Sequence, residues 1–195
     1  MVFMGKRVTK KVMLSLAIVC PSLFVVLLSC FVLVITGTVT LSVSGFAVDH
    51  FDRLYIGTTN EIRVYEESRI VKNISPHTSR TYVFTIQEGE NILLSTSTKV
   101  YVMDLDGNVL ETKEDPGADI YNQLSYQKGR FISDKGDIYR MSSVFGWTRI
   151  TKNSTEIVYQ IDVLSFCVKL LLAICAIVIF VFPVWALIEQ RLGDK

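Results

Sequence analysis

The middle of this 195-residue chain carries one sequence pattern three times without gaps. The clearest stretch begins at Leu54, Ile92 and Arg130, so each start follows the previous one by 38 positions. Each copy alternates runs rich in Val, Ile, Tyr, Phe and Thr with Gly, Pro, Asp or Asn, which is typical of short strands joined by turns. A repeat period near 40 residues indicates a fold built from several copies of one small sheet.

The pattern predicts four strands in each copy. They are residues 45–49, 53–58, 61–66 and 69–74 in the first copy, 81–87, 91–96, 99–104 and 108–113 in the second, and 119–126, 130–133, 137–142 and 146–151 in the third. Residues 157–161 match the first strand of a further copy, because Tyr159 stands 38 positions after Tyr121. The alternative is a twelve-strand sandwich, which has no reason to repeat its interior pattern.

The first copy resembles a blade of the NHL-type or related β-propellers. The resemblance lies in residues 45–49 (GFAVD), 53–60 (RLYIGTTN) and 62–65 (IRVY), and it weakens in the third copy, where Arg130 and Arg140 replace apolar residues. It implies three four-stranded blades. Because propellers usually have about 4–8 blades, it also implies an incomplete propeller. It says little about activity, since propellers host many functions.

Two apolar segments flank the repeats. Residues 12–36 contain no charged side chain, and residues 163–188 contain one, Lys169. Both exceed the roughly 20 apolar residues that cross a hydrocarbon layer about 30 Å thick. We therefore expect two transmembrane helices on either side of an all-β domain at residues 37–162.

The basic residues predict the orientation. Lys6, Arg7, Lys10 and Lys11 precede the first segment, and residues 38–52 contain no Lys or Arg. Because basic side chains favour the cytoplasmic side, we expect cytoplasmic tails at residues 1–11 and 189–195 and an extracytoplasmic domain at the plasma membrane. A cleaved signal peptide is the alternative for the first segment, but its apolar run exceeds the usual core of about 7–15 residues.

The composition argues against several classes of function. Residues 38–162 hold 13 Lys or Arg and 17 Asp or Glu, without the basic stripe of a nucleic-acid binder. All four cysteines lie in the apolar segments, so the domain between them has no disulfide or thiolate metal site. No catalytic or nucleotide-binding motif is present, and the two histidines lack partners at ligand spacing. We expect no enzyme activity, cofactor or metal.

The loops between the second and third strands of each copy are the candidate binding site. In a ring of blades these loops share one end, and binding surfaces often lie on such loops. The candidate residues, for a glycan or a protein ligand, are Asn60, Glu61, Ser97, Lys99, Asp134 and Asp137. Ordinary polar turns are the alternative interpretation.

The apolar segments carry candidate contacts for other membrane helices. Ser15, Ser22 and Ser29 lie seven residues apart, close to two helical turns, and so share a face that allows close helix packing. Their hydroxyls could instead bond to their own helix. The second segment offers a face with Lys169, Ala173 and Ala176. Lys169 either reaches the headgroups or pairs with an acid of a partner.

These observations favour a non-enzymatic accessory or scaffold subunit of a plasma-membrane complex, whose domain completes a propeller by oligomerisation. A homodimer gives six blades, and a heteromeric complex is the other possibility. Tails of about ten residues are too short for a cytoplasmic signalling domain. The alternative function is an extracytoplasmic sensor or glycan-binding subunit that acts through a transporter or receptor partner. A surface hydrolase is the least favoured class.

Overall fold

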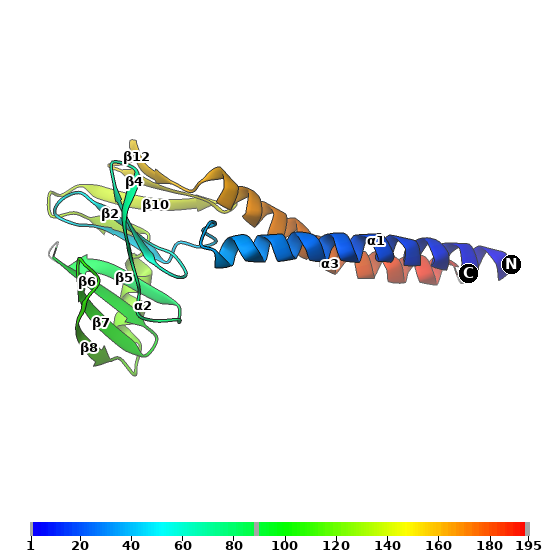
Figure 1. The fold of residues 1–195 in the computed structure, drawn as a ribbon, viewed down its shortest axis with the longest axis horizontal. Helices are drawn as coiled ribbons and strands as arrows, with labels where there is room; N and C mark the ends of the chain where they lie inside the picture. The colour runs from blue at the N-terminus through cyan, green and yellow to red at the C-terminus, as the bar shows by residue number, and fades with distance from the viewer. Residues whose placement is uncertain (1, 88–89, 194–195) are drawn as a thin grey trace. The chain divides into compact units, whose positions relative to one another are not determined.

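The computed structural model describes residues 2–87 and 90–193 and divides the chain into two compact units (Figure 1). One unit contains Met1–Val39 and Val163–Lys195, and the other contains Thr40–Asp162. We call them the helical unit and the β domain.

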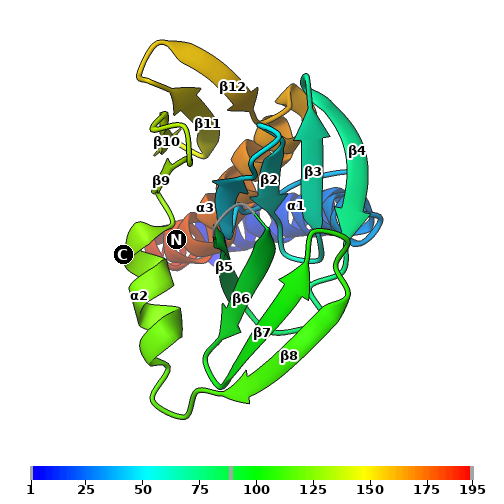
Figure 2. The same ribbon diagram turned by 90° about the vertical axis from the view of Figure 1, so that its left-hand side faces the viewer.

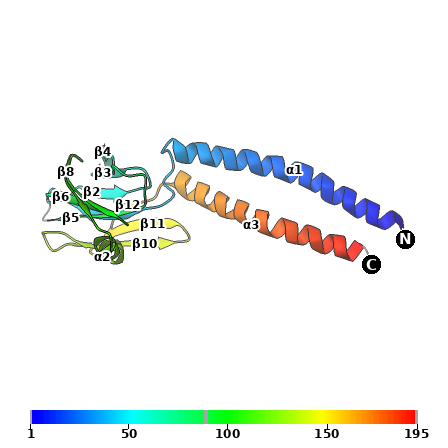
Figure 3. The same ribbon diagram turned by 90° about the horizontal axis from the view of Figure 1, so that it is seen from below.

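The helical unit consists of α1 (Val2–Ile35) and α3 (Val163–Gly193), which lie side by side (Figures 1 and 3). Within them, Ala17–Ile35 and Val163–Val181 have mean hydropathies of 2.9 and 2.8, and few of their side chains are buried. Both helices are long and apolar enough to cross a membrane.

The β domain contains three four-stranded antiparallel sheets, in each of which consecutive strands pair. The first sheet is β1 (Gly45–Val48), β2 (Leu54–Gly57), β3 (Ile62–Glu66) and β4 (Arg69–Ile74). The second is β5 (Tyr82–Gln87), β6 (Asn91–Thr96), β7 (Lys99–Asp104) and β8 (Val109–Glu114). The third is β9 (Arg130–Ile132), β10 (Ile138–Val144), β11 (Trp147–Lys152) and β12 (Glu156–Gln160). The prediction of an all-β domain with three four-stranded sheets between two apolar helices is confirmed.

The prediction of a strand at residues 119–126 is wrong, because the chain forms helix α2 (Asp119–Gln127) there. The buried Asp115 carboxylate accepts hydrogen bonds from the amides of Asp119 (3.1 Å) and Ile120 (3.0 Å), which satisfies donors at the helix start. The third copy therefore supplies only three strands. Residues 156–160 complete its sheet as β12 instead of beginning a further copy.

The first sheet lies between the other two. Alternate side chains of its strands point to opposite faces: Ala47, Tyr55 and Val64 pack against the second sheet, whereas Phe46 and Ile56 pack against the third. All residues of β1 and β2 are buried for this reason. The spatial order of the sheets is therefore third, first, second, which differs from their order along the chain.

Helix α2 covers the remaining face of the second sheet, where it packs on β5 and β6 (Figure 2). Its one buried side chain is Leu124, while Tyr126 is 93% exposed. The second sheet is thus covered by the first sheet on one face and by α2 on the other.

The helical structure of residues 119–127 makes a specific prediction about stability. Leu124→Ala should lower the free energy of unfolding of the β domain by about 2–5 kcal/mol, because it leaves a cavity under α2. Tyr126→Ala should change it by less than about 0.5 kcal/mol, because that side chain is exposed. Denaturant unfolding of the full chain, followed by fluorescence, measures both. In a strand these two residues would share one face, so equal losses would contradict the helix.

Candidate binding groove

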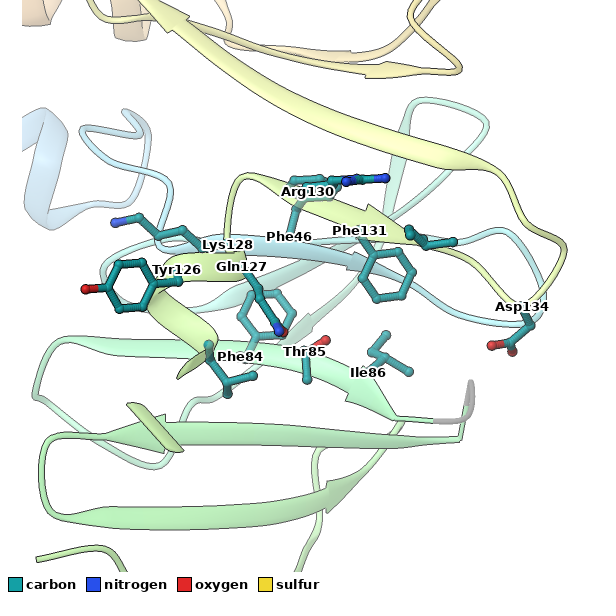
Figure 4. Close-up of a pocket in the computed structure, with 12 residues that line it drawn as sticks. Phe46, Phe84, Thr85, Ile86, Tyr126, Gln127, Lys128, Arg130, Phe131 and Asp134 are labelled. Carbon is teal, nitrogen blue, oxygen red and sulfur yellow. The ribbon is translucent and has the colours of Figure 1, made fainter. Parts of the chain in front are cut away.

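A groove of about 560 Å³ opens where β1, β5, β9 and α2 meet (Figure 4). The three strands are the first strands of their sheets, and each is an edge strand. We call this feature the central groove. It combines apolar and charged side chains in one concave surface, which makes it the default binding-site hypothesis.

The floor of the central groove is apolar. Phe46, Phe84 and Ile86 are buried there, and Phe131 is half-buried and packs against the same core residues. Gly57 permits this packing, since an added Cβ there would lie 2.7 Å from the Phe84 ring. The floor is therefore held in place by the domain core and does not need a ligand to form.

The rim of the central groove is polar and exposed. It carries Tyr126, Gln127, Lys128 and Arg130, all of which are exposed, at the end of α2 and the start of β9. Asp134 is the one acidic residue among those that line the groove, and Figure 4 shows it at the end away from Lys128. A ligand would therefore meet an aromatic ring and two cations close together.

The positive charge continues from the groove onto the third sheet. Arg130 of β9 stands directly opposite Arg140 of β10, and Arg140 stands opposite Thr151, two residues from Arg149. All three arginines are exposed and lie on the face of the sheet that points away from the first sheet. None of the ion pairs among the described residues involves Lys128, Arg130 or Arg140.

Directly opposed like charges destabilise a pair of strands, so the Arg130–Arg140 pair has a cost that an anion would relieve. The Arg149 side chain donates a hydrogen bond to the Ser142 hydroxyl at 3.2 Å, which holds it on the same face. In the part of the chain that the structure describes, no three His, Cys, Asp or Glu residues are grouped to hold a metal ion.

The first two candidate loops lie next to each other. The Thr58 hydroxyl donates to the Glu61 carbonyl (2.9 Å), and the Thr96 hydroxyl donates to the Lys99 carbonyl (3.0 Å), so both loops form the same turn. Tyr82 joins them: its hydroxyl donates to the carbonyls of Thr58 (2.6 Å) and Glu61 (3.0 Å), and its backbone pairs with Thr96. Burial raises the pKa of Tyr82, which keeps the hydroxyl protonated as a donor.

The candidate side chains at these two loops differ in their contacts. Glu61 accepts a 2.6 Å hydrogen bond from the Arg63 guanidinium, which also donates to the Thr40 hydroxyl at 3.2 Å. Asn60, Ser97 and Lys99 are exposed and have no hydrogen bond or ion pair from their side chains in the described structure. The two loops thus form one polar surface that is separate from the central groove.

The third loop, residues 133–137, lies elsewhere. Because α2 replaces the expected first strand, β9 becomes the first strand of its sheet, and this loop joins a first strand to a second. Its Lys135 forms an ion pair with Asp52, which lies between β1 and β2. The structure therefore does not bring Asp134 and Asp137 to the other four candidates.

Asp134 and Asp137 have different surroundings. Asp134 lines the central groove. Asp137 accepts hydrogen bonds from Lys152 (2.8 Å) and from the Asn153 side chain (2.8 Å), and these bonds lower the pKa of its carboxyl. Asp137 holds two neighbouring strands of the third sheet together, so only Asp134 is placed to meet a ligand in the groove.

Two of the candidate contact residues in α1 form hydrogen bonds within their own helix. The hydroxyls of Ser22 and Ser29 donate to the carbonyls of Ile18 (2.8 Å) and Val25 (2.9 Å), and both serines are on an exposed face. Ser15 lies outside the residues whose side chains are described. The helix face that carries Ser22 and Ser29 can still pack closely against another helix, because a small side chain bonded to its own helix takes little space.

The candidate contacts in α3 lie away from its buried face. Ser165, Val168 and Cys175 are buried, whereas Ala173 and Ala176 are exposed. Lys169 is half-buried. The small residues Ala173 and Ala176 therefore face the surroundings of the helical unit, where another helix or lipid would meet them.

The comparisons with known proteins identify no family. A scan against protein-family models finds no match, and a search of curated proteins finds none. Among solved structures, a protein of unknown function from Bacteroides caccae has a TM-score of 0.32 at 11% identity, over 62% of this chain and 46% of that chain. A catalytically inactive virginiamycin B lyase from Staphylococcus aureus, solved with quinupristin, has a TM-score of 0.35 at 8% identity, over 63% and 42%. The matches span less than half of those two proteins.

The role of Tyr82 in holding the first two loops can be tested. Tyr82→Phe should lower the free energy of unfolding by about 1–3 kcal/mol, because it removes the donor from two carbonyls in a buried setting. Tyr126→Phe is the matched control, since its hydroxyl is exposed, and should leave stability unchanged. If Tyr82→Phe is as stable as the unmodified protein, the hydroxyl does not anchor the loop.

Proposed function

We propose that the chain is a non-enzymatic, membrane-anchored subunit whose β domain lies outside the cytoplasm and binds an acidic sugar chain in the central groove. The observation that carries this proposal is the exposed Tyr126 beside Lys128 and Arg130, above an apolar floor. Carboxylates form strong charge-assisted hydrogen bonds with such cations. An aromatic ring offers an apolar face to a sugar ring and a hydroxyl to its polar edge.

The row of arginines supports an extended ligand. Arg130, Arg140 and Arg149 follow one another across three strands of the third sheet, so a chain with a carboxylate on successive units could pair with each in turn. A small neutral ligand would leave the Arg130–Arg140 repulsion unrelieved. These features favour a polyanion over a neutral sugar.

The membrane arrangement is proposed from the apolar helices and the basic N-terminal residues. Helices α1 and α3 have the length and composition to cross a bilayer, and the positive-inside rule puts residues 1–11 and 189–195 in the cytoplasm. The β domain then faces the outside of the plasma membrane, where polysaccharides are available as ligands.

We also propose that the subunit acts through partner helices in the membrane. Lys169 lies within the apolar part of α3, where a charged residue indicates function by default. Ser22, Ser29, Ala173 and Ala176 are exposed small residues, of the kind that allow helices to approach closely. These residues support an accessory role in a heteromeric membrane complex.

A homodimer that completes a six-bladed ring is the second candidate. The exposed Ile132 and Ile157 favour it, because they place apolar surface on the third sheet. Helix α2 argues against it: in a ring of two copies the outer face of the third sheet would meet the outer face of the partner's second sheet, where α2 already packs on β5 and β6. The mass of the native complex distinguishes a dimer from a heteromeric assembly.

The ligand proposal predicts a charge-dependent interaction. Full-length protein in lipid nanodiscs should bind oligogalacturonate and not the uncharged methyl ester of the same oligosaccharide. Arg130→Gln and Lys128→Gln should each weaken binding about tenfold, the equivalent of one charge-assisted hydrogen bond. Calorimetry measures the affinities. Arg69→Gln, at an exposed position on β4, is the matched control and should bind normally.

Tyr126→Ala extends this test, because it should weaken binding without changing stability. Equal affinity of the charged and uncharged oligosaccharides, or unchanged binding by Arg130→Gln, would contradict the proposed site. If oligogalacturonate binds and only the loop variants Asn60→Ala and Lys99→Ala weaken it, the ligand lies on the polar surface at the first two loops instead.

The partner proposal makes a separate prediction. Lys169→Leu, or Leu at both Ser22 and Ser29, should abolish co-purification of other membrane subunits with the full chain, whereas Lys169→Arg should preserve it because the charge is kept. Quantitative mass spectrometry of the purified complex measures the loss. Retention of the same partners by Lys169→Leu would show that the lysine only reaches the headgroups.

A further inference from the structure

The β10–β11 hairpin ends in an exposed apolar tip that the folding of the domain does not explain. Phe145 at the turn is 97% exposed and the preceding Val144 is 63% exposed. The hairpin is visible in Figure 3 as the strand pair β10 and β11. Residues 141–148 contain no charged side chain, although Arg140 and Arg149 stand directly outside them.

The backbone of the turn makes Phe145 an unexpected residue there. Phe145 and Gly146 have φ angles of 50° and 83°, and Val144 pairs with Trp147, which defines a two-residue hairpin turn. Turns with positive φ at both central residues favour Asn or Asp before Gly, because a larger side chain is disfavoured in the left-handed region. A phenylalanine at this position therefore opposes the local backbone preference and buries nothing within the domain.

The position of the tip along the chain indicates what it meets. The Ile161 amide donates to the Thr148 carbonyl at 2.9 Å, so Ile161 continues the pairing of β12 beside the base of the hairpin tip. Helix α3 begins at Val163, two residues later, and its apolar segment begins at that same residue. Two residues span at most about 7 Å, so the apolar segment starts within that length of chain from the residue paired with Thr148.

The direction of the hairpin agrees with this placement. Strands β10 and β12 both pair antiparallel with β11, so they run in the same direction. The chain leaves β12 in the direction in which β10 runs to its tip. Because Thr148 is level with Ile161, Phe145 at the turn is about three residues further on, roughly 10 Å at the rise of a strand.

We propose that the tip of the β10–β11 hairpin inserts into the lipid headgroup region of the membrane that the chain enters at Val163. This inference rests on the proposed membrane anchoring. Phe145 and Val144 supply apolar contact, and the aromatic Trp147 is of the kind enriched at membrane interfaces. The hairpin thereby fixes one side of the β domain to the membrane surface.

Fluorescence of the full chain in vesicles tests the insertion. In a Trp185→Phe variant, Trp147 is the single tryptophan, because the chain has two. Its emission should fall in vesicles of phosphatidylcholine brominated near the start of the acyl chains, relative to unbrominated vesicles. In the same background, Phe145→Asn should reduce this loss while leaving the domain at least as stable, since Asn accepts the turn conformation. Phe51→Asn, at another exposed phenylalanine, is the matched control and should leave the loss unchanged.

The possible outcomes distinguish insertion of the hairpin tip from anchoring of the chain in the membrane by its helices. Equal Trp147 emission in both kinds of vesicle, with the protein retained after alkaline extraction, would overturn the insertion and leave the anchoring intact. Release of the protein by alkaline extraction would overturn both. A Phe145→Asn variant that unfolds more easily and keeps the full loss of emission would assign Phe145 a structural role and also overturn the proposal.

Discussion

The burial of the first sheet on both faces is the interaction on which the β domain depends. Every residue of β1 and β2 is buried, because one set of alternate side chains packs on the second sheet and the other set packs on the third. Phe131 contacts both clusters and so connects the two cores. Removal of the first sheet would separate the other two, which have little direct contact through their strands.

The central groove follows from that arrangement. With the third sheet beside the first, the chain must pass from the end of the second sheet to the start of the third, and it does so through α2. Asp115 starts this helix, Leu124 seats it on the second sheet, and its last residues leave Tyr126 and Lys128 exposed at the opening. The exposed residues of the candidate site at the end of α2 are therefore present because a helix replaces the strand that the repeat predicts.

Much of the fold could be predicted from the sequence, because alternation and turn residues define strands locally. Eleven of the twelve strands predicted for the three copies form, with ends that differ by one or two residues. The repeat period predicts a strand at residues 119–126 against their own composition: Asp115 and Pro116 precede them, an acid stands in the first turn, and β-branched residues are scarce. These local features indicate a helix, which is what the structure shows at residues 119–127.

The order of the sheets and the groove were not predictable in the same way, since both depend on contacts between distant segments. Two signals were nevertheless present. Continuous apolar runs at Phe46-Ala47-Val48 and Leu54-Tyr55-Ile56 are typical of strands buried on both faces. Arg130 and Arg140 interrupt the apolar pattern of the repeat, and the structure places them opposite each other, with Arg130 in the lining of the groove. The six loop residues followed from an assumed ring, and only Asp134 reaches this site.

Hydrogen exchange of the full chain in nanodiscs, with and without oligogalacturonate, tests the central claim most directly. We expect the ligand to slow exchange in the peptides that cover α2, β9 and β10, and to leave exchange at β4 unchanged. Unchanged exchange at α2 and β9, or slowing confined to other strands, would contradict an acidic ligand in the central groove.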